Sequence, residues 1–411
     1  MRDKQIERLI EQEETRQKRV INLIASENFV SDDVREALGS VFTNKYAEGY
    51  PGKRYYAGCE TVDELEKLAR ARALKLFIRS PADRRKWSVN VQPYSGSPAN
   101  LAVYLALVKP GDTIMGMALD AGGHLTHGAK VSASGKLWKA VHYNVDRKTE
   151  KLNYGAILRI ARKEKPKILI AGWSAYSRVP DFNKFRKIVD AVGAIFMVDI
   201  SHFAGLVAGG AYPSPFPYAD IVMTTTHKTL RGPRAALVFA RKLKIKNSKL
   251  TIAQAIDKAV FPGVQGGPHV NQIAALAVAL HEAAQPSFKK YAKQIIKNAR
   301  ALSNELARLG WRIVSGGTDS HLFSMDTMLR GVSGGVAEAR LAAAGITVNK
   351  ESIPFDKRPP ADPSGIRLGT AAVTTRLPGW QAGGMNERDM IRLAKKITAA
   401  LLEDSTSATR A

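Results

Sequence analysis

Short apolar runs alternate with helical stretches through the middle of the chain, between about residues 87 and 240. The intervening stretches place their apolar residues at helical spacing, whereas the runs themselves resemble buried strands. This alternation predicts an α/β fold with a mainly parallel sheet, because parallel strands are covered by helices on both faces. The predicted strands are 88–91, 113–118, 167–171, 194–198, 221–225 and 235–239, with helices in the gaps.

The two ends of the chain have different patterns. Ile6, Leu9 and Ile10 recur at helical spacing in a polar segment, which predicts an amphipathic N-terminal helix. After residue 268 the pattern is helical and then mixed, and a last helix is predicted to begin at Asn386, with Asp389 placed for a capping box. Short strands are predicted at 312–314, 322–325 and 346–349. The predicted organisation is a helical arm (1–25), a large α/β domain (26–268) and a smaller C-terminal α+β domain (269–411).

Composition narrows the class of protein. Hydrophobic residues make up 45% of the 411 residues, which is ample for a globular core. The single cysteine, Cys59, excludes an internal disulfide and a multi-cysteine zinc site, and no metal is expected. The N-terminus lacks an apolar signal core, and no apolar run is long enough to cross a bilayer. We therefore expect a cytoplasmic protein that does not bind membranes.

The charge balance is strongly positive, since 62 Lys and Arg residues exceed 37 Asp and Glu residues by 25. Such a surface admits nucleic acid or anionic small molecules as partners. The sequence contains no zinc module, RNP-like aromatic strand or basic heptad region, so we expect nucleic acid binding to be weak and non-specific. Several cations fall on one predicted helix face, which is typical of a solvated surface: Lys289, Lys290, Lys293, Lys297 and Arg300.

A candidate phosphate site lies at the start of a predicted helix. Ser95, Gly96 and Ser97 follow a predicted strand, and Pro98 follows them. We expect Ser97 to be the N-cap and Pro98 the first helical residue. Unpaired amides and the helix dipole at such a start favour an anion. An ordinary capped helix would explain this segment equally well if it stood alone.

Two further polar positions end neighbouring predicted strands. Asp199 ends one apolar run and is followed by His202, while the next run leads through three threonines to His227 and Lys228. A lysine at a buried strand end is costly unless it is paired or neutral, and a desolvated amine can form a Schiff base with a carbonyl group. A phosphate site, a strand-end Asp and a strand-end Lys are the parts that pyridoxal phosphate requires. The sequence thus predicts that cofactor.

The same residues resemble one family along nearly the whole chain, serine hydroxymethyltransferase. The runs that carry the resemblance are 23–28 (LIASEN), 43–56 (TNKYAEGYPGKRYY), 90–93 (NVQP), 122–128 (GGHLTHG), 174–177 (SAYS), 198–199 (VD), 202–207 (HFAGLV), 224–230 (TTTHKTL), 261–263 (FPG), 265–268 (QGGP) and 364–367 (SGIR). The resemblance implies a fold-type I pyridoxal phosphate enzyme, usually a homodimer and in some cases a tetramer, with its sites at the subunit boundary.

The resemblance also implies roles for individual residues. Lys228 would hold the aldehyde of the cofactor, Asp199 would pair with its pyridine nitrogen, and His124 would stack on its ring. The remaining implied cofactor contacts are Ser95, Gly96, Ser97, Ser174, His202, Gly266, Gly267 and, from the neighbouring subunit, Tyr46. The implied catalytic set is Lys228, Glu48, Asp199, His124 and His227.

Substrate contacts follow from the same resemblance. Arg367 would bind the substrate carboxylate, and Glu48 would act as an acid or base. Ser26, Tyr56 and His202 would complete the amino acid site. The implied folate contacts are Tyr55, Leu119, Gly123, His124 and Leu125, although Leu119 and Leu125 would be assigned to the core without the resemblance.

The implied reaction is the reversible conversion of serine and tetrahydrofolate to glycine and methylenetetrahydrofolate. Glu351 and Ala361 depart from the family pattern near the folate pocket, so a related tetrahydropterin is an alternative carrier. The second enzymatic hypothesis is a folate-independent aldolase that acts on threonine or other β-hydroxy amino acids. Lys228, Asp199 and Arg367 would serve both reactions.

Overall fold

The computed structural model describes residues 1–375 and 383–402. The chain forms two compact units. Unit 1 comprises Met1–Phe29, Ala175–Arg178 and Lys293–Ala411, and unit 2 comprises Val30–Ser174 and Val179–Ala292. The three-part division expected from the sequence, with boundaries after residues 25 and 268, stays a prediction.

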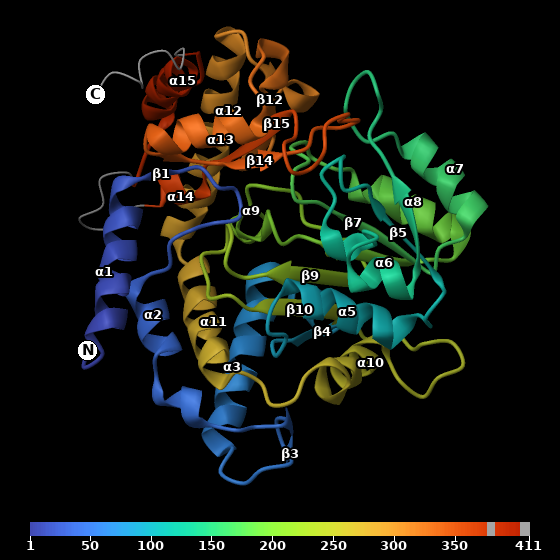
Figure 1. Cartoon of the computed structure of the whole chain (residues 1–411). Coiled ribbons are helices and arrows are strands. Elements are labelled where there is room, and N and C mark those ends of the chain that lie inside the picture. Colours follow the sequence, from blue (N-terminus) through green and yellow to red (C-terminus); the bar gives the residue numbers. More distant parts are fainter. Residues whose placement is uncertain (376–382, 403–411) are drawn as a thin grey trace. The chain divides into compact units, whose positions relative to one another are not determined.

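Unit 2 is built on a seven-stranded sheet (Figure 1). Its order is β4 (Trp87–Asn90), β10 (Ala236–Arg241), β9 (Ile221–Thr225), β8 (Ile195–Asp199), β7 (Ile168–Gly172), β5 (Thr113–Met117) and β6 (Lys139–Tyr143). Only β10 runs against the other strands of this sheet, because it pairs antiparallel with both β4 and β9 while the remaining pairs are parallel. The predicted α/β class and mainly parallel sheet are confirmed.

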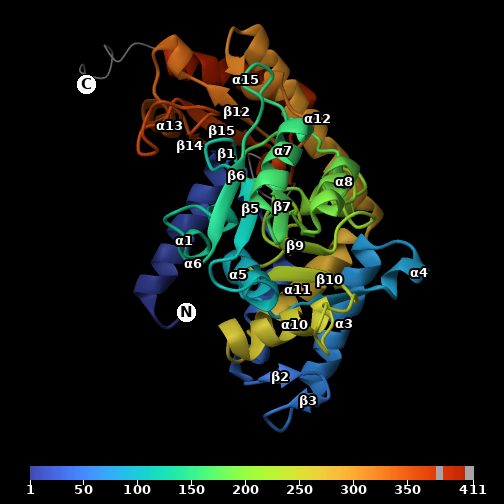
Figure 2. The ribbon, with the colours of Figure 1, turned by 90° about the vertical axis from the view of Figure 1, so that its right-hand side faces the viewer.

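Helices cover both faces of this sheet (Figure 1 and Figure 2). The helices of unit 2 are α2 (Asp32–Leu38), α3 (Glu60–Phe77), α4 (Pro81–Arg84), α5 (Gly96–Leu107), α6 (Ala133–Leu137), α7 (Tyr154–Glu164), α8 (Phe182–Val192), α9 (Ala204–Ala208), α10 (Ile252–Lys258) and α11 (Val270–Ala283). On one face, Val103 of α5 and Ile256 of α10 join the buried core beside Met223 of β9. On the other face, Phe185 of α8 stacks on Phe196 of β8 with ring centroids 5.9 Å apart. Burial of each such side chain stabilises the fold by about 1.5–3 kcal/mol.

Unit 1 contains a four-stranded antiparallel sheet in the order β11 (Arg312–Ile313), β12 (Leu322–Asp326), β15 (Gly365–Gly369) and β14 (Asn349–Glu351). A separate parallel pair joins β1 (Ile21–Asn22) to β13 (Ile346–Thr347). The predicted strand at 346–349 is therefore two strands, β13 and β14, in different sheets. The segment that became β15 was not predicted as a strand.

The helices of unit 1 include α1 (Lys4–Arg19), α13 (Gly334–Ala343), α14 (Ala371–Thr374) and α15 (Glu387–Leu402), and α12 (Pro286–Arg308) contains the boundary at residue 293. The predicted cap of α15 is confirmed, because the backbone N–H of Asn386 donates to Asp389 Oδ2 at 2.9 Å. None of the residues of α1 is buried. Within residues 1–375 and 383–402, no helix has both the length and the apolar character needed to cross a membrane.

Candidate active site

The start of helix α5 differs from the expectation. The N-cap is Ser95, not Ser97, and the helix begins at Gly96, so Pro98 occupies the third helical position rather than the first. The carbonyl of Ser95 accepts the first helical bond, from Ala99 N at 3.2 Å. Pro98 is tolerated there because amides of the first turn have no intrahelical partner, and a proline has no amide hydrogen to leave unpaired. The unpaired amides of this turn, with the hydroxyls of Ser95 and Ser97, form a site suited to an anion.

Gly96 is required by a close approach between this turn and strand β9. A Cβ atom at Gly96 would lie 2.6 Å from Thr225 Cγ2, well inside van der Waals contact. Gly96 therefore allows the first turn of α5 to pack directly beside the end of β9, where Thr225 leads to Lys228.

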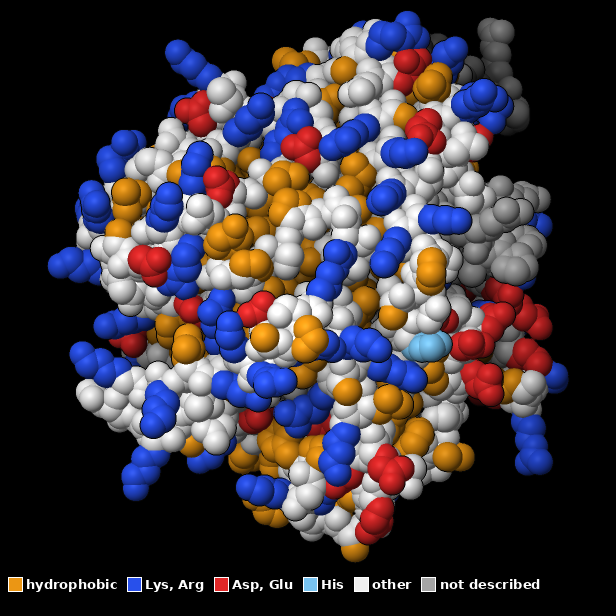
Figure 3. Space-filling model, turned by 180° about the vertical axis from the view of Figure 1, so that it is seen from behind, with side chains coloured by type: hydrophobic (Ala, Val, Ile, Leu, Met, Phe, Trp, Pro, Cys, Tyr) orange, Lys and Arg blue, Asp and Glu red, His pale blue; other side chains and the backbone are white. Residues whose placement is uncertain are grey.

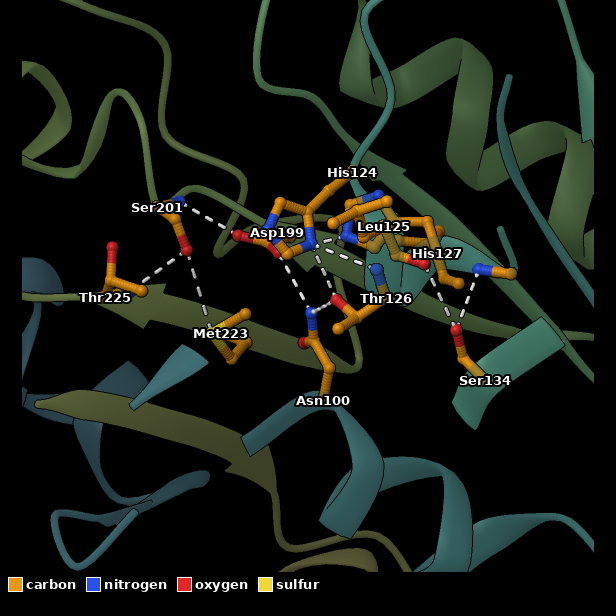
Figure 4. Close-up of polar contacts among 12 residues, drawn as sticks. Asn100, His124, Leu125, Thr126, His127, Ser134, Asp199, Ser201, Met223 and Thr225 are labelled. Atoms are coloured by element: carbon orange, nitrogen blue, oxygen red, sulfur yellow. Dashed lines mark hydrogen bonds and ion pairs between the residues drawn. The ribbon is translucent and has the colours of Figure 1, made fainter. Parts of the chain in front are cut away.

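Asp199 lies at the end of β8 at the centre of a buried hydrogen-bond network (Figure 4). Its Oδ2 accepts from His127 Nε2 at 3.0 Å and from Asn100 Nδ2 at 3.2 Å, and its Oδ1 accepts from Ser201 N at 3.0 Å. Burial alone would raise the pKa of Asp199, but its hydrogen bond to His127 and the charge of that histidine outweigh burial and hold the pKa well below its ordinary value. Asp199 is therefore an ionised carboxylate in a buried setting.

The network continues from Asn100 to His124. Asn100 Nδ2 also donates to Thr126 Oγ1 at 2.8 Å. Thr126 Oγ1 lies 2.7 Å from His124 Nδ1, and the backbone N–H of Thr126 donates to the same nitrogen at 3.2 Å. The half-buried imidazole of His124 is thus held by the residues that surround Asp199.

Lys228 lies three residues beyond β9 and is half-buried. Its Nζ donates to Thr225 Oγ1 at 3.0 Å. Burial, together with the charges of Lys228 and Arg234, lowers the pKa of the neighbouring His227 to about 3. His227 is therefore neutral at physiological pH, so it adds no positive charge beside the amine of Lys228.

The structure brings many of the predicted residues together in one cavity of about 140 Å³ within unit 2. The predicted residues that line it are Ser95, Gly96, Ser97, His124, Ser174, Asp199, His202, His227 and Lys228. They meet because the carboxyl ends of parallel strands, together with the loops that follow them, lie at one edge of a sheet.

Several residues of this cavity were not predicted: Asn100, His127, Trp173, Ser201, Met223, Thr225 and Arg234. A signal for two of them was present in the sequence. Asn100 lies four residues after Gly96 and so occupies the same face of α5, and His127 belongs to the same motif as His124.

Five predicted residues form a second cluster that does not line the cavity. A Cβ atom at Gly266 would lie 3.4 Å from Glu48 Oε1, and one at Gly267 would lie 3.2 Å from Tyr46 Cε1. The charge of Glu48 raises the pKa of Tyr46, whose ring centroid lies 5.0 Å from that of Tyr56. Tyr46 is 54% exposed and Tyr56 is 46% exposed, so these rings present a large apolar area to solvent.

The predicted folate contacts also lie in unit 2. Leu119 is 45% exposed and Leu125 is 47% exposed, so their assignment to the core, which would be made without the resemblance, is wrong. Tyr55 is 76% exposed and lies beside Phe261, with ring centroids 5.7 Å apart. Gly123 is buried at a point where a Cβ atom would lie 2.2 Å from the carbonyl oxygen of Met117.

The two remaining predicted residues, Ser26 and Arg367, belong to unit 1. Arg367 lies on β15 with its side chain almost fully buried, and its Nε donates to Asn349 Oδ1 at 3.2 Å and lies 3.7 Å from Glu351 Oε2. Ser26 follows Ala25, which packs against the end of β15, since a Cβ atom at Gly369 would lie 2.4 Å from Ala25 Cα.

The residues of the cavity fit pyridoxal phosphate. The cofactor needs a carboxylate for its ring nitrogen, an amine for its aldehyde and an anion site for its phosphate. One cavity supplies all three, with Asp199, Lys228 and the first turn of α5.

A family model described as serine hydroxymethyltransferase matches residues 1–397. The chain belongs to the serine hydroxymethyltransferase family. It therefore has the fold of a fold-type I pyridoxal phosphate enzyme, as the resemblance implied.

Individual relatives agree with the family match. A serine hydroxymethyltransferase from Desulfotalea psychrophila is 57% identical over 374 residues, which cover 91% of this chain and 84% of the relative. One from Acidobacterium capsulatum is 54% identical over 399 residues, which cover 97% of this chain and 88% of the relative. One from Coprothermobacter proteolyticus is 53% identical over 403 residues, which cover 98% of this chain and 92% of the relative.

Proposed function

We propose that this chain reversibly converts L-serine and tetrahydrofolate to glycine and 5,10-methylenetetrahydrofolate, with pyridoxal phosphate as its cofactor. The observation that carries the proposal is the single cavity that unites Asp199, Lys228 and the first turn of α5. Serine hydroxymethyltransferases that match 91% or more of the chain support the same reaction.

Pyridoxal phosphate, when bound, supplies the electron sink for cleavage of the bond between Cα and Cβ of serine. We expect Lys228 to hold its aldehyde, Asp199 to keep a proton on its ring nitrogen, and the first turn of α5 to hold its phosphate. The ionised state of Asp199 supports its part, since only a carboxylate stabilises a protonated ring nitrogen. His124 would cover the ring and exclude water, and Ser174 and His202 would border its edge.

The remaining predicted residues would hold the substrate groups. Arg367 would bind the carboxylate of serine through its guanidinium, with Ser26 and Tyr56 close to the amino acid. Glu48 would hold or move the proton of the serine hydroxyl group. Tyr55, Leu119, Gly123 and Leu125 would border the pterin, and the exposed apolar surface of Leu119 and Leu125 supports this role.

We propose a homodimer in which Tyr46, Gly266 and Gly267 of one subunit complete the cavity of the other. Two observations support this assembly. These residues cluster together yet do not line the cavity of their own chain, and Ile6, Leu9 and Ile10 of α1 are 46%, 54% and 52% exposed.

Mixed dimers test this assembly. A dimer that combines one Lys228→Ala chain with one Tyr46→Phe chain contains one intact site only if Tyr46 acts in the partner subunit. Activity above that of both parent dimers is the expected result. Activity that never exceeds the parents would contradict the shared site.

The reaction itself is tested by turnover of serine with and without tetrahydrofolate. Strict dependence on the pterin is expected. The family match does not favour the folate-independent aldolase, and cleavage of serine at the same rate without pterin would revive that hypothesis.

We also propose a cytoplasmic location and no specific nucleic acid partner. Sequence-selective binding that survives added salt would contradict the second point.

A further inference from the structure

The loop that carries Glu48 is held by a buried arginine for which no role has been assigned. Arg54 Nη1 donates to the carbonyl oxygen of Ala47 at 3.0 Å and to that of Gly49 at 2.7 Å. These two carbonyls flank Glu48 in the chain. The carbonyl of Glu48 itself accepts from the backbone N–H of Tyr55 at 3.0 Å. Three consecutive carbonyls are therefore fixed around the proposed acid/base residue.

Two carboxylates of helix α3 hold the other side of the guanidinium. Arg54 Nε donates to Asp63 Oδ1 at 2.8 Å, and Arg54 Nη2 donates to Glu66 Oε2 at 2.8 Å. The side chains of Arg54 and Glu66 are 4% and 1% exposed. Water screens such a buried arrangement little, so the geometry of the arginine is strongly determined.

The same network reaches the loop that leads to the phosphate site. Gln92 Nε2 donates to the carbonyl of Gly49 at 2.9 Å and to Glu66 Oε2 at 3.0 Å. The carbonyl of Gln92 accepts from Gln265 Nε2 at 2.9 Å, and Gln265 precedes Gly266. The network thus joins the Glu48 loop, the segment before Ser95 and the loop that contains Gly266.

A purely structural role would be served by an arginine that binds carbonyls anywhere on this loop. The observed contacts are specific to the peptide groups on both sides of Glu48, whose half-buried carboxylate faces the Gly266 segment. A small rotation of these peptides would turn the Glu48 side chain, because the direction of Cβ follows the backbone.

We propose that Arg54 is a positioning residue for Glu48, which fixes the backbone on both sides of Glu48 and so directs its carboxylate toward the transferred hydroxymethyl group. This inference rests on the proposed function. A lysine cannot reproduce the role, since one ammonium group cannot span two carbonyls and two carboxylates with the same planar fork.

The test compares Arg54→Lys, Glu48→Gln and the double variant in the full-length holoenzyme. We expect Arg54→Lys to lower kcat for tetrahydrofolate-dependent serine cleavage by about tenfold or more, since misplacement of a reacting group by about 1 Å can cost up to a hundredfold. The affinities for pyridoxal phosphate and glycine should fall by far less than kcat, because Arg54 binds the peptide groups beside Glu48 directly but reaches the Gly266 loop only through Glu66, Gln92 and Gln265. The double variant should be no slower than Glu48→Gln alone, as expected for residues that act as a unit.

Arg186→Lys is the matched control. Arg186 also binds a carboxylate, Asp220 at 2.9 Å, and a backbone carbonyl, that of Tyr218 at 3.3 Å, within unit 2. The Arg186→Lys variant should have a lower thermal stability than wild type and an unchanged kcat. If Arg54→Lys does not fold, Asp63→Asn provides a milder change, because it removes one of the two carboxylate charges that hold the guanidinium of Arg54. It should give a smaller loss of kcat, again with little effect on the affinities for pyridoxal phosphate and glycine.

Three outcomes distinguish a failure of the proposed function from a failure of the proposed role of Arg54. Wild-type protein that does not convert serine with tetrahydrofolate would refute the proposed function. Active wild type with an unchanged kcat in a folded Arg54 or Asp63 variant would refute the role of Arg54. Losses that multiply in the double variant, or that fall equally on kcat, cofactor affinity and glycine affinity, would show that Arg54 is structural only.

Discussion

Gly96→Ala is predicted to weaken cofactor binding while the fold is retained. The added Cβ would lie 2.6 Å from Thr225 Cγ2, whereas carbon atoms in contact are about 3.5–4.0 Å apart. The start of α5 or Thr225 must therefore shift by about 1 Å. Both shifts affect the site, because Thr225 accepts from Lys228 Nζ and α5 presents the phosphate site.

The size of the effect follows from the cost of overpacking. Insertion of one methyl group into a tightly packed site costs about 1–3 kcal/mol. If that cost falls on the geometry that binds the phosphate, the dissociation constant rises by about 5- to 150-fold, since 1.4 kcal/mol corresponds to a factor of ten. The measurement is a titration of the apoprotein with pyridoxal phosphate, followed by visible absorbance, with thermal unfolding as a check on the fold.

Gly155→Ala provides the same substitution without the clash. Gly155 lies in the first turn of α7, and the nearest atom to an added Cβ is Asn153 Oδ1 at 3.5 Å, which is ordinary contact. Its affinity for pyridoxal phosphate should equal that of wild type. A folded Gly96→Ala protein with wild-type affinity would refute the placement of the phosphate at the start of α5.

Lys228→Ala should lose the visible absorbance of the imine and nearly all turnover, and a variant that keeps both would contradict the role of Lys228. The low folded pKa of Asp199 should stabilise the apoprotein above about pH 4, the ordinary pKa of an unfolded Asp, and this contribution should fade as the pH falls toward the folded pKa. In urea denaturation, the stability of wild type relative to Asp199→Asn should therefore decrease as the pH falls below about 4. Glu351→Gln should lower KM for serine by up to about fivefold, because Glu351 competes with the substrate carboxylate for Arg367 at a cost of about 1 kcal/mol. An unchanged KM would show that Glu351 and the substrate do not compete for Arg367. Lys and Arg are spread widely over the face seen in Figure 3, and the net charge is +25. If this charge steers anionic ligands, the apparent KM for tetrahydrofolate should rise with ionic strength, whereas a KM that is independent of salt would exclude steering.

Most of the central sheet could be predicted because its strands are buried on both faces and read as continuous apolar runs. Strand β9 was predicted with its observed bounds, and the neighbouring strands differ by a residue or two. Strand β6 was missed because it lies at the edge of the sheet, where only Tyr143 of its five residues is buried. Strand β15 was missed because Arg367 interrupts a short segment between two glycines, and its burial depends on strands β12 and β14.

The candidate site could be predicted only in part. Asp199 and Lys228 were found because each follows an apolar run. The hydrogen bond between Asp199 and His127 could not be found in this way, because the two residues are 72 positions apart and nothing local links them. The start of α5 was misplaced because Ser95 and Ser97 are equally good caps, and the packing of Gly96 against Thr225 decides between them.

The strand order of the large sheet has a consequence for synthesis of the chain. Strand β4, which leads to the phosphate site, pairs with β10, and β10 follows Lys228 in the sequence. The ribosome must therefore release the chain beyond residue 241 before β4 finds its neighbour and the cavity closes. Pyridoxal phosphate cannot guide the early steps of folding in this arrangement. It can only bind a sheet that is already assembled, and thereby stabilise the folded state relative to the unfolded one.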